Sequence, residues 1–316
     1  MQKLLFTITL PSMRIAFVGK GGSGKTTAAT IFAQYMNGQG KRVLALDADI
    51  NQHLATALGY GDTLPSMGME FDLIKQYLRG SNERFSAADM KKTTPPGRGS
   101  KLVTLDDGDW FIKNYTRSTN GIRVAGAGDI PEGNVGVKCY HGLNGAVELM
   151  LGHLLDTDDD MVVVDMTAGA DAFSSTLFAK VDALVLVVEP TLKSLSVYEQ
   201  FLPNITRYGL PFFVLGNKIV DQADRDFILA TIPSLAAEIP QAPSIRARER
   251  GQKAQTEPEV IGAFSQLWQA LKAGAPRDWD RLEQLSHDLH LKNADSWAGQ
   301  AVKRHIDPEF TLRSVL

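Results

Sequence analysis

Cysteine is scarce in this sequence of 316 residues, since Cys139 is the only one. A single cysteine excludes an intramolecular disulfide and fits a reducing compartment, so we expect a cytoplasmic protein. The sequence also lacks any apolar run close to the roughly 20 residues that a membrane-spanning helix needs. Neither sign of charge dominates, because 33 Lys and Arg residues stand against 36 Asp and Glu residues. The net charge of −3 gives no overall attraction to nucleic acid or anionic lipid.

What the sequence does contain is an alternation of strand and helix patterns. Several short runs are apolar throughout, which is typical of parallel strands covered by helices on both faces. The alternation predicts an α/β fold with a doubly wound, mostly parallel sheet. The expected strands are 14–18, 42–46, 122–125, 161–164, 183–188, 211–215 and 237–239, and the expected helices are 25–37, 71–78, 143–155, 192–208, 258–272 and 278–289.

The strongest motif runs from Gly19 to Thr27 and reads GKGGSGKTT. It matches the phosphate-loop pattern G-x-x-x-x-G-K-[ST], and it lies between a predicted strand and a predicted helix. Its glycines allow backbone amides to point at phosphate oxygens, and the helix N-terminus adds positive potential. Lys25 should reach the β- and γ-phosphates of ATP, and Thr26 should be a ligand of Mg²⁺. The expected nucleotide-binding residues here are Gly21, Gly22, Ser23, Gly24, Lys25, Thr26 and Thr27.

A second lysine, Lys20, stands near the start of this loop. A loop of the form K-G-G-x-G-K-[ST] resembles that of the deviant Walker A ATPases, which include MinD/ParA-type ATPases, nitrogenase iron protein, arsenite-pump ATPases and metal-insertion ATPases. In that family this lysine crosses a nucleotide-sandwich dimer and acts on the partner's phosphates as an arginine finger does. The resemblance therefore implies that Lys20 is catalytic and that the working unit is a homodimer across the nucleotide.

The same resemblance extends over roughly residues 14–265 and assigns further roles. Asp49 resembles the switch I residue that positions the attacking water. Asp165 ends an apolar run like a Walker B strand, where it would reach Mg²⁺. Gly169 resembles the switch II glycine whose amide binds a γ-phosphate. Asn217 resembles the base-recognition asparagine, and Pro240 belongs to a stretch similar to the one that covers the adenine.

Two neighbouring positions refine these assignments. A guanine-specific motif would need aspartate at position 220, where this sequence has Val220, and this favours ATP over GTP. Asp47 lies two residues before Asp49 and is a second candidate for the switch I role. The alternative interpretation is that Asp47 caps the end of the strand.

Cys139 and His141 are the candidate ligands for a transition metal. The glycine-rich segment around them resembles the CooC-type ATPases, which are nickel-insertion accessory proteins of carbon monoxide dehydrogenase. Those proteins carry C-x-C at this place, whereas this sequence has C-x-H. A two-fold dimer would bring two copies together as a Cys₂His₂ site for Ni²⁺ or Zn²⁺. The alternative is a small buried cysteine followed by a histidine at the start of a helix.

The resemblance thus predicts a dimeric switch ATPase that binds and hydrolyses Mg-ATP, slowly without a client, and that serves as an accessory factor for a metalloenzyme. The alternative is a MinD/ParA-type spatial organiser that acts on DNA, a membrane or a protein partner. The acidic helix 278–289 is a poor lipid anchor. The run Arg246, Arg248 and Arg250 could contact DNA phosphates, but it is short and interrupted by Glu249, which favours a solvated helix face. We therefore expect neither a membrane nor nucleic acid as partner. An electron carrier like nitrogenase reductase would need a second cysteine in each subunit.

The expected organisation has three parts. Residues 1–12 are an N-terminal appendage, and residues 13–274 form a P-loop ATPase domain with a loop-rich insertion at about 60–120. Residues 275–316 form a C-terminal helical tail. A surface that docks a client protein is one hypothesis for both the insertion and the tail.

Overall fold

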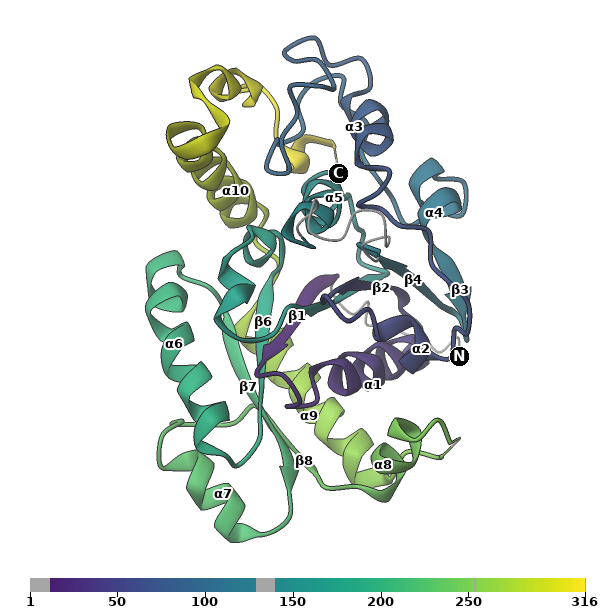
Figure 1. Cartoon of the computed structure of the whole chain (residues 1–316), viewed down its shortest axis with the longest axis vertical. Coiled ribbons are helices and arrows are strands. Elements are labelled where there is room, and N and C mark those ends of the chain that lie inside the picture. The colour runs from purple at the N-terminus through teal and green to yellow at the C-terminus, as the bar shows by residue number, and fades with distance from the viewer. Residues whose placement is uncertain (1–11, 129–139, 253, 316) are drawn as a thin grey trace, which may run out of the picture.

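A computed structural model describes residues 12–128, 140–252 and 254–315 of the chain. Within these ranges the chain forms an eight-stranded sheet in the order β3-β4-β2-β5-β1-β6-β7-β8 (Figure 1). β3 pairs antiparallel with β4, and every other neighbouring pair of strands is parallel. The predicted α/β fold with a mostly parallel, doubly wound sheet is therefore confirmed. The predicted appendage, 1–12, lies outside the described residues except for Ser12.

All seven expected strands are present, and one strand was not predicted. The strands are β1 Met13–Gly19, β2 Arg42–Ala48, β3 Arg117–Thr119, β4 Ile122–Gly126, β5 Asp160–Met166, β6 Ala183–Val188, β7 Phe212–Ile219 and β8 Ala237–Pro240. The missed strand, β3, joins β4 through Asn120 and Gly121, which have φ angles of 51° and 80°. Positive φ at both residues is what a two-residue hairpin turn with the Asn-Gly sequence requires.

The six expected helices also form, and α5 ends at Gly152 rather than at residue 155. Four short helices were not predicted, namely α2, α4, α7 and α8. Two of them begin with an aspartate cap, since Asp109 accepts from the amide of Phe111 and Asp221 from that of Asp224. The helices are α1 Lys25–Gly38, α2 Leu54–Leu58, α3 Phe71–Arg79, α4 Trp110–Tyr115, α5 Tyr140–Gly152, α6 Leu192–Tyr208, α7 Gln222–Leu229, α8 Pro243–Glu249, α9 Pro258–Gly274 and α10 Trp279–Asn293.

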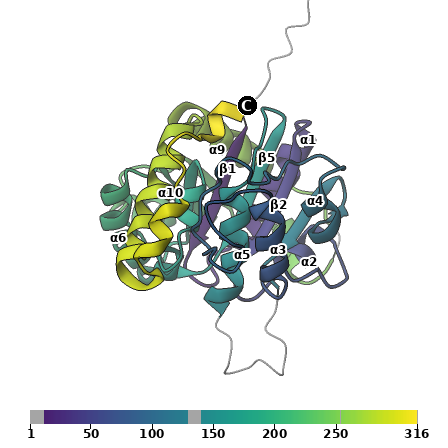
Figure 2. The same cartoon turned by 90° about the horizontal axis from the view of Figure 1, so that it is seen from above.

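Two apolar cores lie on opposite faces of the sheet. Alternate residues of β1 divide between them, so that Ala16 and Val18 face one core while Ile15 and Phe17 face the other. The first core packs against α3, α5, α6 and α10, and the second packs against α1, α2 and α9. Figures 1 and 2 show the strands between these two layers of helices. None of the described helices is long and apolar enough to cross a membrane.

The predicted insertion and the predicted tail pack on each other. In Figure 1 the chain after α10 runs toward the loops around α3. Side chains from residues 93–98 meet side chains from residues 290–307, and the rings of Phe85 and His305 pack at a tilt with centroids 4.6 Å apart. The polar contacts are Thr93 Oγ1 with His290 Nδ1 at 2.9 Å, Thr94 Oγ1 with His305 Nδ1 at 3.2 Å, and Arg98 Nε with Asp307 Oδ2 at 2.9 Å.

A buried ionic network fastens the start of the tail to the sheet. Asp156 accepts hydrogen bonds from Arg14, at 2.6 Å, and from Arg277, at 2.5 Å. Arg277 also pairs with Asp182, at 2.9 Å, and both arginines lie over the ring of Trp279. Burial would raise the pKa of Asp156, but the two guanidinium groups outweigh burial and lower that pKa well below its ordinary range. Residues 277–279 are thus held by paired charges.

Candidate nucleotide-binding site

The phosphate loop joins the end of β1 to the start of α1. Gly24 precedes the helix with a φ of +97°, and a Cβ there would lie 2.3 Å from Nδ2 of Asn217, so that only glycine fits. The loop closes through a hydrogen bond from the Ser23 amide to the Lys20 carbonyl, at 3.0 Å. No side chain of the described residues caps the N-terminus of α1. Its first amides can therefore bind an anion.

Lys25 lies beside the end of β2. Its Nζ is 3.6 Å from Oδ2 of Asp49, and both side chains are buried. The other carboxylate oxygen of Asp49 accepts from the backbone amide and the side-chain amide of Asn51, both at 3.0 Å. The carboxylate of Asp47 accepts from the amides of Asp49, at 3.2 Å, and Leu54, at 2.8 Å. Asp49 thus faces the lysine, while Asp47 holds the loop that carries it.

Asp165 and Thr26 form the second polar pair. The Thr26 hydroxyl donates to Oδ2 of Asp165 at 2.6 Å, whereas Oδ1 of Asp165 is buried without a hydrogen-bond partner among the described residues. Burial raises the pKa of Asp165 to about 7, although Thr26 and Lys25 lower it. Asp47 is its register partner on β2, and burial followed by the charge of Asp165 raises the pKa of Asp47 as well.

These groups fit Mg²⁺. A free carboxylate oxygen beside a threonine hydroxyl presents the hard oxygen ligands that Mg²⁺ prefers, and a cation there would offset the cost of burying the Asp165 charge. Thr26 on α1 and Asp165 on β5 are the two residues predicted from the sequence to hold Mg²⁺, and the structure brings them within hydrogen-bond distance of each other.

Glu189 is a site residue that the sequence analysis missed. It directly follows β6, and its carboxylate pairs with Nζ of Lys20 at 2.9 Å and with Nζ of Lys218 at 2.8 Å. Lys218 also donates to the carbonyl of Gly22 at 2.6 Å. Burial would raise the pKa of Glu189, but the hydrogen bonds from Lys218 and Lys20 outweigh burial and lower it. Its place at the carboxyl end of a parallel strand is the signal that could have indicated it.

A pocket of about 250 Å³ lies next to the phosphate loop. Asn217 and Pro240, the two residues predicted to contact the base, both line it, together with Thr27 and Ile245. The Asn217 side chain donates to the carbonyl of Ser23 at 2.7 Å, so it also holds the loop. Gly169 begins the short helix η2 Gly169–Phe173 with a φ of +67°, and the space beside its Cα is open.

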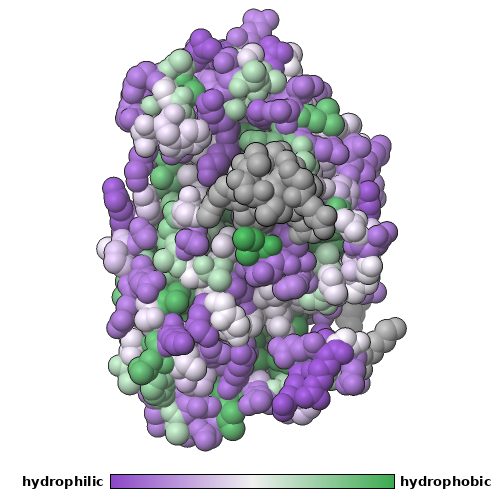
Figure 3. Space-filling model, in the orientation of Figure 1, coloured by the Kyte–Doolittle hydropathy of each residue, from purple (hydrophilic) through white to green (hydrophobic). Residues whose placement is uncertain are grey.

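The arginine run of α8 is partly engaged within the chain. Arg248 donates to Gln34, to the carbonyl of Ala254 and to Thr256. Arg246 lines the pocket beside the phosphate loop. The face of the molecule in Figure 3 is mostly hydrophilic, with apolar side chains scattered over it rather than gathered into one patch.

The predicted transition-metal ligands are not placed together by this structure. Cys139 lies outside the described residues. His141 lies in the first turn of α5, and its side chain is also outside the description. Among the described residues, no group of three or more His, Cys, Asp or Glu side chains could hold a metal ion.

Comparison with known proteins places this site in a family. Residues 15–309 match the family described as the CobQ/CobB/MinD/ParA nucleotide binding domain. The carbon monoxide dehydrogenase accessory protein CooC of Rhodospirillum rubrum is 30% identical over 243 residues, which cover 75% of this chain and 87% of that protein. An uncharacterized ATP-binding protein of Methanocaldococcus jannaschii is 27% identical over 235 residues, which cover 70% of this chain and 88% of that protein.

Solved structures show the same fold. The cell division ATPase MinD of Pyrococcus furiosus superposes with a TM-score of 0.55 at 21% identity, over 82% of this chain and 98% of that one. A putative plasmid partition protein of Borrelia burgdorferi bound to AMPPNP gives a TM-score of 0.56 at 13% identity, over 83% and 99%. At such identities the likeness concerns the fold. The match over residues 15–309, together with the phosphate loop and the carboxylates around it, shows that the chain belongs to the CobQ/CobB/MinD/ParA family of nucleotide-binding proteins.

Proposed function

We propose that this protein is an ATP-hydrolysing molecular switch that works as a homodimer in the maturation of a metalloenzyme. The observation that carries the ATPase part is the meeting of two pairs at the phosphate loop. These are Lys25 with Asp49, at 3.6 Å, and Thr26 with Asp165, at 2.6 Å. Phosphoryl transfer depends mainly on positioning and on charge stabilisation, and these four side chains supply both.

Each residue then has a defined task. Lys25 and the loop amides bind the phosphates, and Thr26 and Asp165 hold Mg²⁺. When bound, Mg²⁺ neutralises part of the negative charge on the phosphates. Asp49 orients the water that attacks, because Asn51 holds its carboxylate and leaves it facing Lys25. Asn217 and Pro240 contact the adenine from the adjacent pocket.

Lys20 is the cation that each chain would supply to the phosphates bound by its partner. In the single chain its ammonium group pairs with Glu189, at 2.9 Å, and 30% of the side chain is exposed at the mouth of the loop. Glu189 is buried but keeps Lys218 as a second partner at 2.8 Å, so Lys20 can exchange Glu189 for the phosphates of a partner chain without leaving that carboxylate unpaired. Dimerisation across the nucleotide would therefore complete the site, and hydrolysis would be slow until a client promotes it.

The metalloenzyme role is supported by the similarity to the accessory protein of Rhodospirillum rubrum, which extends over 75% of this chain. In a two-fold dimer, Cys139 and His141 from both chains would give the four nitrogen and sulfur ligands that Ni²⁺ or Zn²⁺ accepts. The change of dimer geometry on hydrolysis would then release the metal to the client. The alternative, DNA binding through the arginine run of α8, has less support, because Arg248 at the centre of that run is engaged within the chain.

The test loads the purified protein with Ni²⁺ or Zn²⁺ in the presence of ADP or a non-hydrolysable ATP analogue. Dimer mass and metal content are then measured on the same sample. We expect one metal ion per dimer in the native protein, and loss of the metal in Cys139→Ser and His141→Ala. The matched control is His53→Ala, which changes an exposed histidine at the start of α2. A nucleotide-dependent dimer that binds no metal, or a Cys139→Ser variant that binds as much as the native protein, would overturn the metal role.

A further inference from the structure

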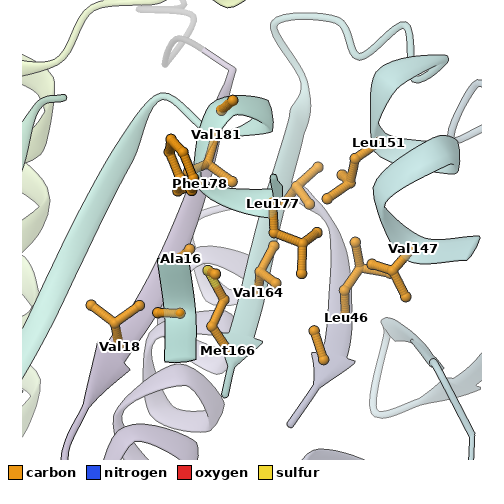
Figure 4. Close-up of a cluster of buried hydrophobic side chains, with 14 of the residues drawn as sticks. Ala16, Val18, Leu46, Val147, Leu151, Val164, Met166, Leu177, Phe178 and Val181 are labelled. Atoms are coloured by element: carbon orange, nitrogen blue, oxygen red, sulfur yellow. The ribbon is translucent and has the colours of Figure 1, made fainter. Parts of the chain in front are cut away.

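A small cavity lies between α5, α10 and the short helix η3 Leu177–Lys180. Pro95 and Pro96 of the insertion form another part of its wall, so the insertion and the tail both meet the central fold here. Leu151 of α5 lines the cavity and belongs, with Leu177 of η3, to the apolar cluster shown in Figure 4. The volume of the cavity is about 20 Å³. One water molecule needs about 10–15 Å³, so the cavity admits a molecule or ion of very few atoms.

Lys180 is a buried cation at the edge of this cavity. Its side chain is only 3% exposed. A Cβ added to Gly152 would lie 3.4 Å from Nζ of Lys180 and 3.7 Å from its Cε. Because Gly152 and Lys180 both line the cavity, the ammonium end of the lysine reaches it. Among the described residues, Glu148 and Arg14 act on this ammonium group through their charges alone, without a hydrogen bond.

The other buried charges near Lys180 already have partners. Nη2 of Arg14 pairs with Oδ1 of Asp156 at 2.6 Å, and Nζ of Lys92 pairs with Oε1 of Glu148 at 3.1 Å. Each of these pairs balances its own charge, whereas no carboxylate in the described part of the chain forms an ion pair with Lys180. A buried charge without a paired counter-ion strongly destabilises a folded protein.

Two further groups beside the cavity do not neutralise this lysine. Glu283 of α10 is the one carboxylate among the lining residues, and it accepts a hydrogen bond from the backbone amide of Leu312. Gly152 is the last residue of α5, and a helix C-terminus carries only about half of a negative elementary charge. Burial lowers the pKa of Lys180 to about 8, while Glu148 raises it, so the amine is mostly protonated at pH 7.

The walls of the cavity restrict the kind of anion that could be the counter-ion. Ala179, Leu282 and Leu312 line it with buried apolar side chains. A dianion such as phosphate or sulfate would lose more hydration there than one ammonium group can replace. His287 of α10 also lines the cavity and can donate one N–H to an anion. A single positive charge and a small volume therefore match a small monovalent anion.

We propose that this cavity binds one small monovalent anion, such as chloride or formate, as the counter-ion of Lys180. The anion lies between η3 and α10, next to the prolines of the insertion, so its binding stabilises the packing of the tail and the insertion on the central fold. This role goes beyond the proposed function and requires neither the nucleotide nor the transition metal.

The test measures thermal unfolding in a buffer whose only anion is gluconate, which is too large for the cavity. Sodium chloride, formate or sulfate then replaces gluconate at constant ionic strength. An anion that binds only the folded chain stabilises it by the factor 1 + [anion]/Kd, which is about 20-fold for about 100 mM anion and a Kd of about 5 mM. We expect chloride or formate to raise the melting temperature of the native protein by a few degrees.

Each anion is compared in the native protein and in Lys180→Met, because sulfate stabilises proteins in general. The variant keeps a long side chain but removes the charge, so we expect it to lose the response to chloride and formate and to keep the response to sulfate. Leu312→Phe keeps Lys180 but fills the cavity, and it should lose the same response. Lys113→Met, which changes an exposed lysine on α4, is the matched control and should respond as the native protein does.

Equal stabilisation of the native protein and of Lys180→Met by chloride and formate would overturn the proposal. A native melting temperature that is the same in gluconate, chloride and formate would also overturn it. If Lys180→Met does not fold, Leu312→Phe and calorimetric titration of the native protein with formate decide between the outcomes. Titration of the same samples with ADP tests the nucleotide site separately, and its affinity should be native in all three variants.

Discussion

Replacing Lys20 by alanine should separate nucleotide binding from hydrolysis. In the single chain Lys20 pairs with Glu189 at 2.9 Å, and its side chain is 30% exposed. The variant keeps Lys25 and the loop amides, which bind the phosphates in its own chain, and Glu189 keeps Lys218 as a partner at 2.8 Å. Nucleotide affinity should therefore stay within about fivefold of the native value, which corresponds to about 1 kcal/mol. A cationic side chain supplied by a partner accelerates phosphoryl transfer by about 10³–10⁵, so hydrolysis should fall at least about 10³-fold.

The assay combines calorimetric titration with ATP analogues and measurement of phosphate release. Mixing experiments make it sharper. A dimer of one Lys20→Ala chain and one Asp49→Ala chain has one complete site, formed by Asp49 of the first chain and Lys20 of the second. In an equal mixture half of the dimers are mixed and half of their sites are complete, so about a quarter of the native rate should return.

Two results would refute this reasoning. A loss of nucleotide affinity of more than about tenfold in Lys20→Ala would mean that the lysine serves its own chain. A mixture as inactive as its two components would mean that no group crosses between chains. Lys113→Ala, which removes an exposed lysine on α4, is the control and should leave both properties unchanged.

Three further predictions concern buried ionisable side chains. Arg277→Met should destabilise the protein by about 3–5 kcal/mol in chemical denaturation, because it leaves buried carboxylates short of a partner, whereas Arg313→Met, at an exposed pair, should change stability by less than about 0.5 kcal/mol. Equal losses of stability in the two variants would show that the buried ion pairs of Arg277 contribute no more to stability than the exposed pair of Arg313. Burial lowers the pKa of His290 to about 4, below its ordinary value of about 6.5, so the unfolded chain binds the extra proton and stability should fall as the pH drops from about 6.5 to 4. The melting temperature should depend less on pH over that range in His290→Gln, and an unchanged dependence would contradict the assignment. Burial raises the pKa of Asp165 to about 7, so the folded chain holds the proton and stability should fall as the pH rises from about 4 to 7. Asp165→Asn should therefore raise the melting temperature of the nucleotide-free protein at pH 8 but not at pH 4, and it should abolish the part of nucleotide affinity that depends on Mg²⁺.

Sequence patterns predicted the central sheet because its strands are apolar on both faces. β6 was predicted with its observed bounds, Ala183–Val188, since no polar residue interrupts that run. β3 was missed because its three residues carry no apolar alternation, although the Asn-Gly pair at 120 and 121 indicates a hairpin. α4 and α7 were missed because they are short, although aspartate caps mark the start of each.

The phosphate loop could be predicted from sequence because its chemistry is local. One contiguous stretch carries the glycines, Lys25 and Thr26, and the strand ends indicate Asp49 and Asp165. The pairing of Glu189 with Lys20 could not be predicted, because the two residues are 169 positions apart in sequence and are brought together by the order of strands in the sheet. The hydrogen bond from the Asn144 side chain to the Ala48 carbonyl could not be predicted for the same reason, because the two residues are 96 positions apart in sequence. Each polar side chain has many possible hydrogen-bond partners elsewhere in the sequence, and only the order of the strands and helices in the fold determines which of them lies within reach.

The contact between the insertion and the tail has a consequence for biosynthesis. Thr93 and His290 meet across 197 residues of sequence. A ribosome that adds about 5–20 residues per second reaches the second residue roughly 10–40 s after the first. During that interval Phe85 and its neighbours have been synthesised, while His305, against which Phe85 packs, has not. The insertion therefore stays without the part of its packing that the tail provides until the last part of the chain has been made.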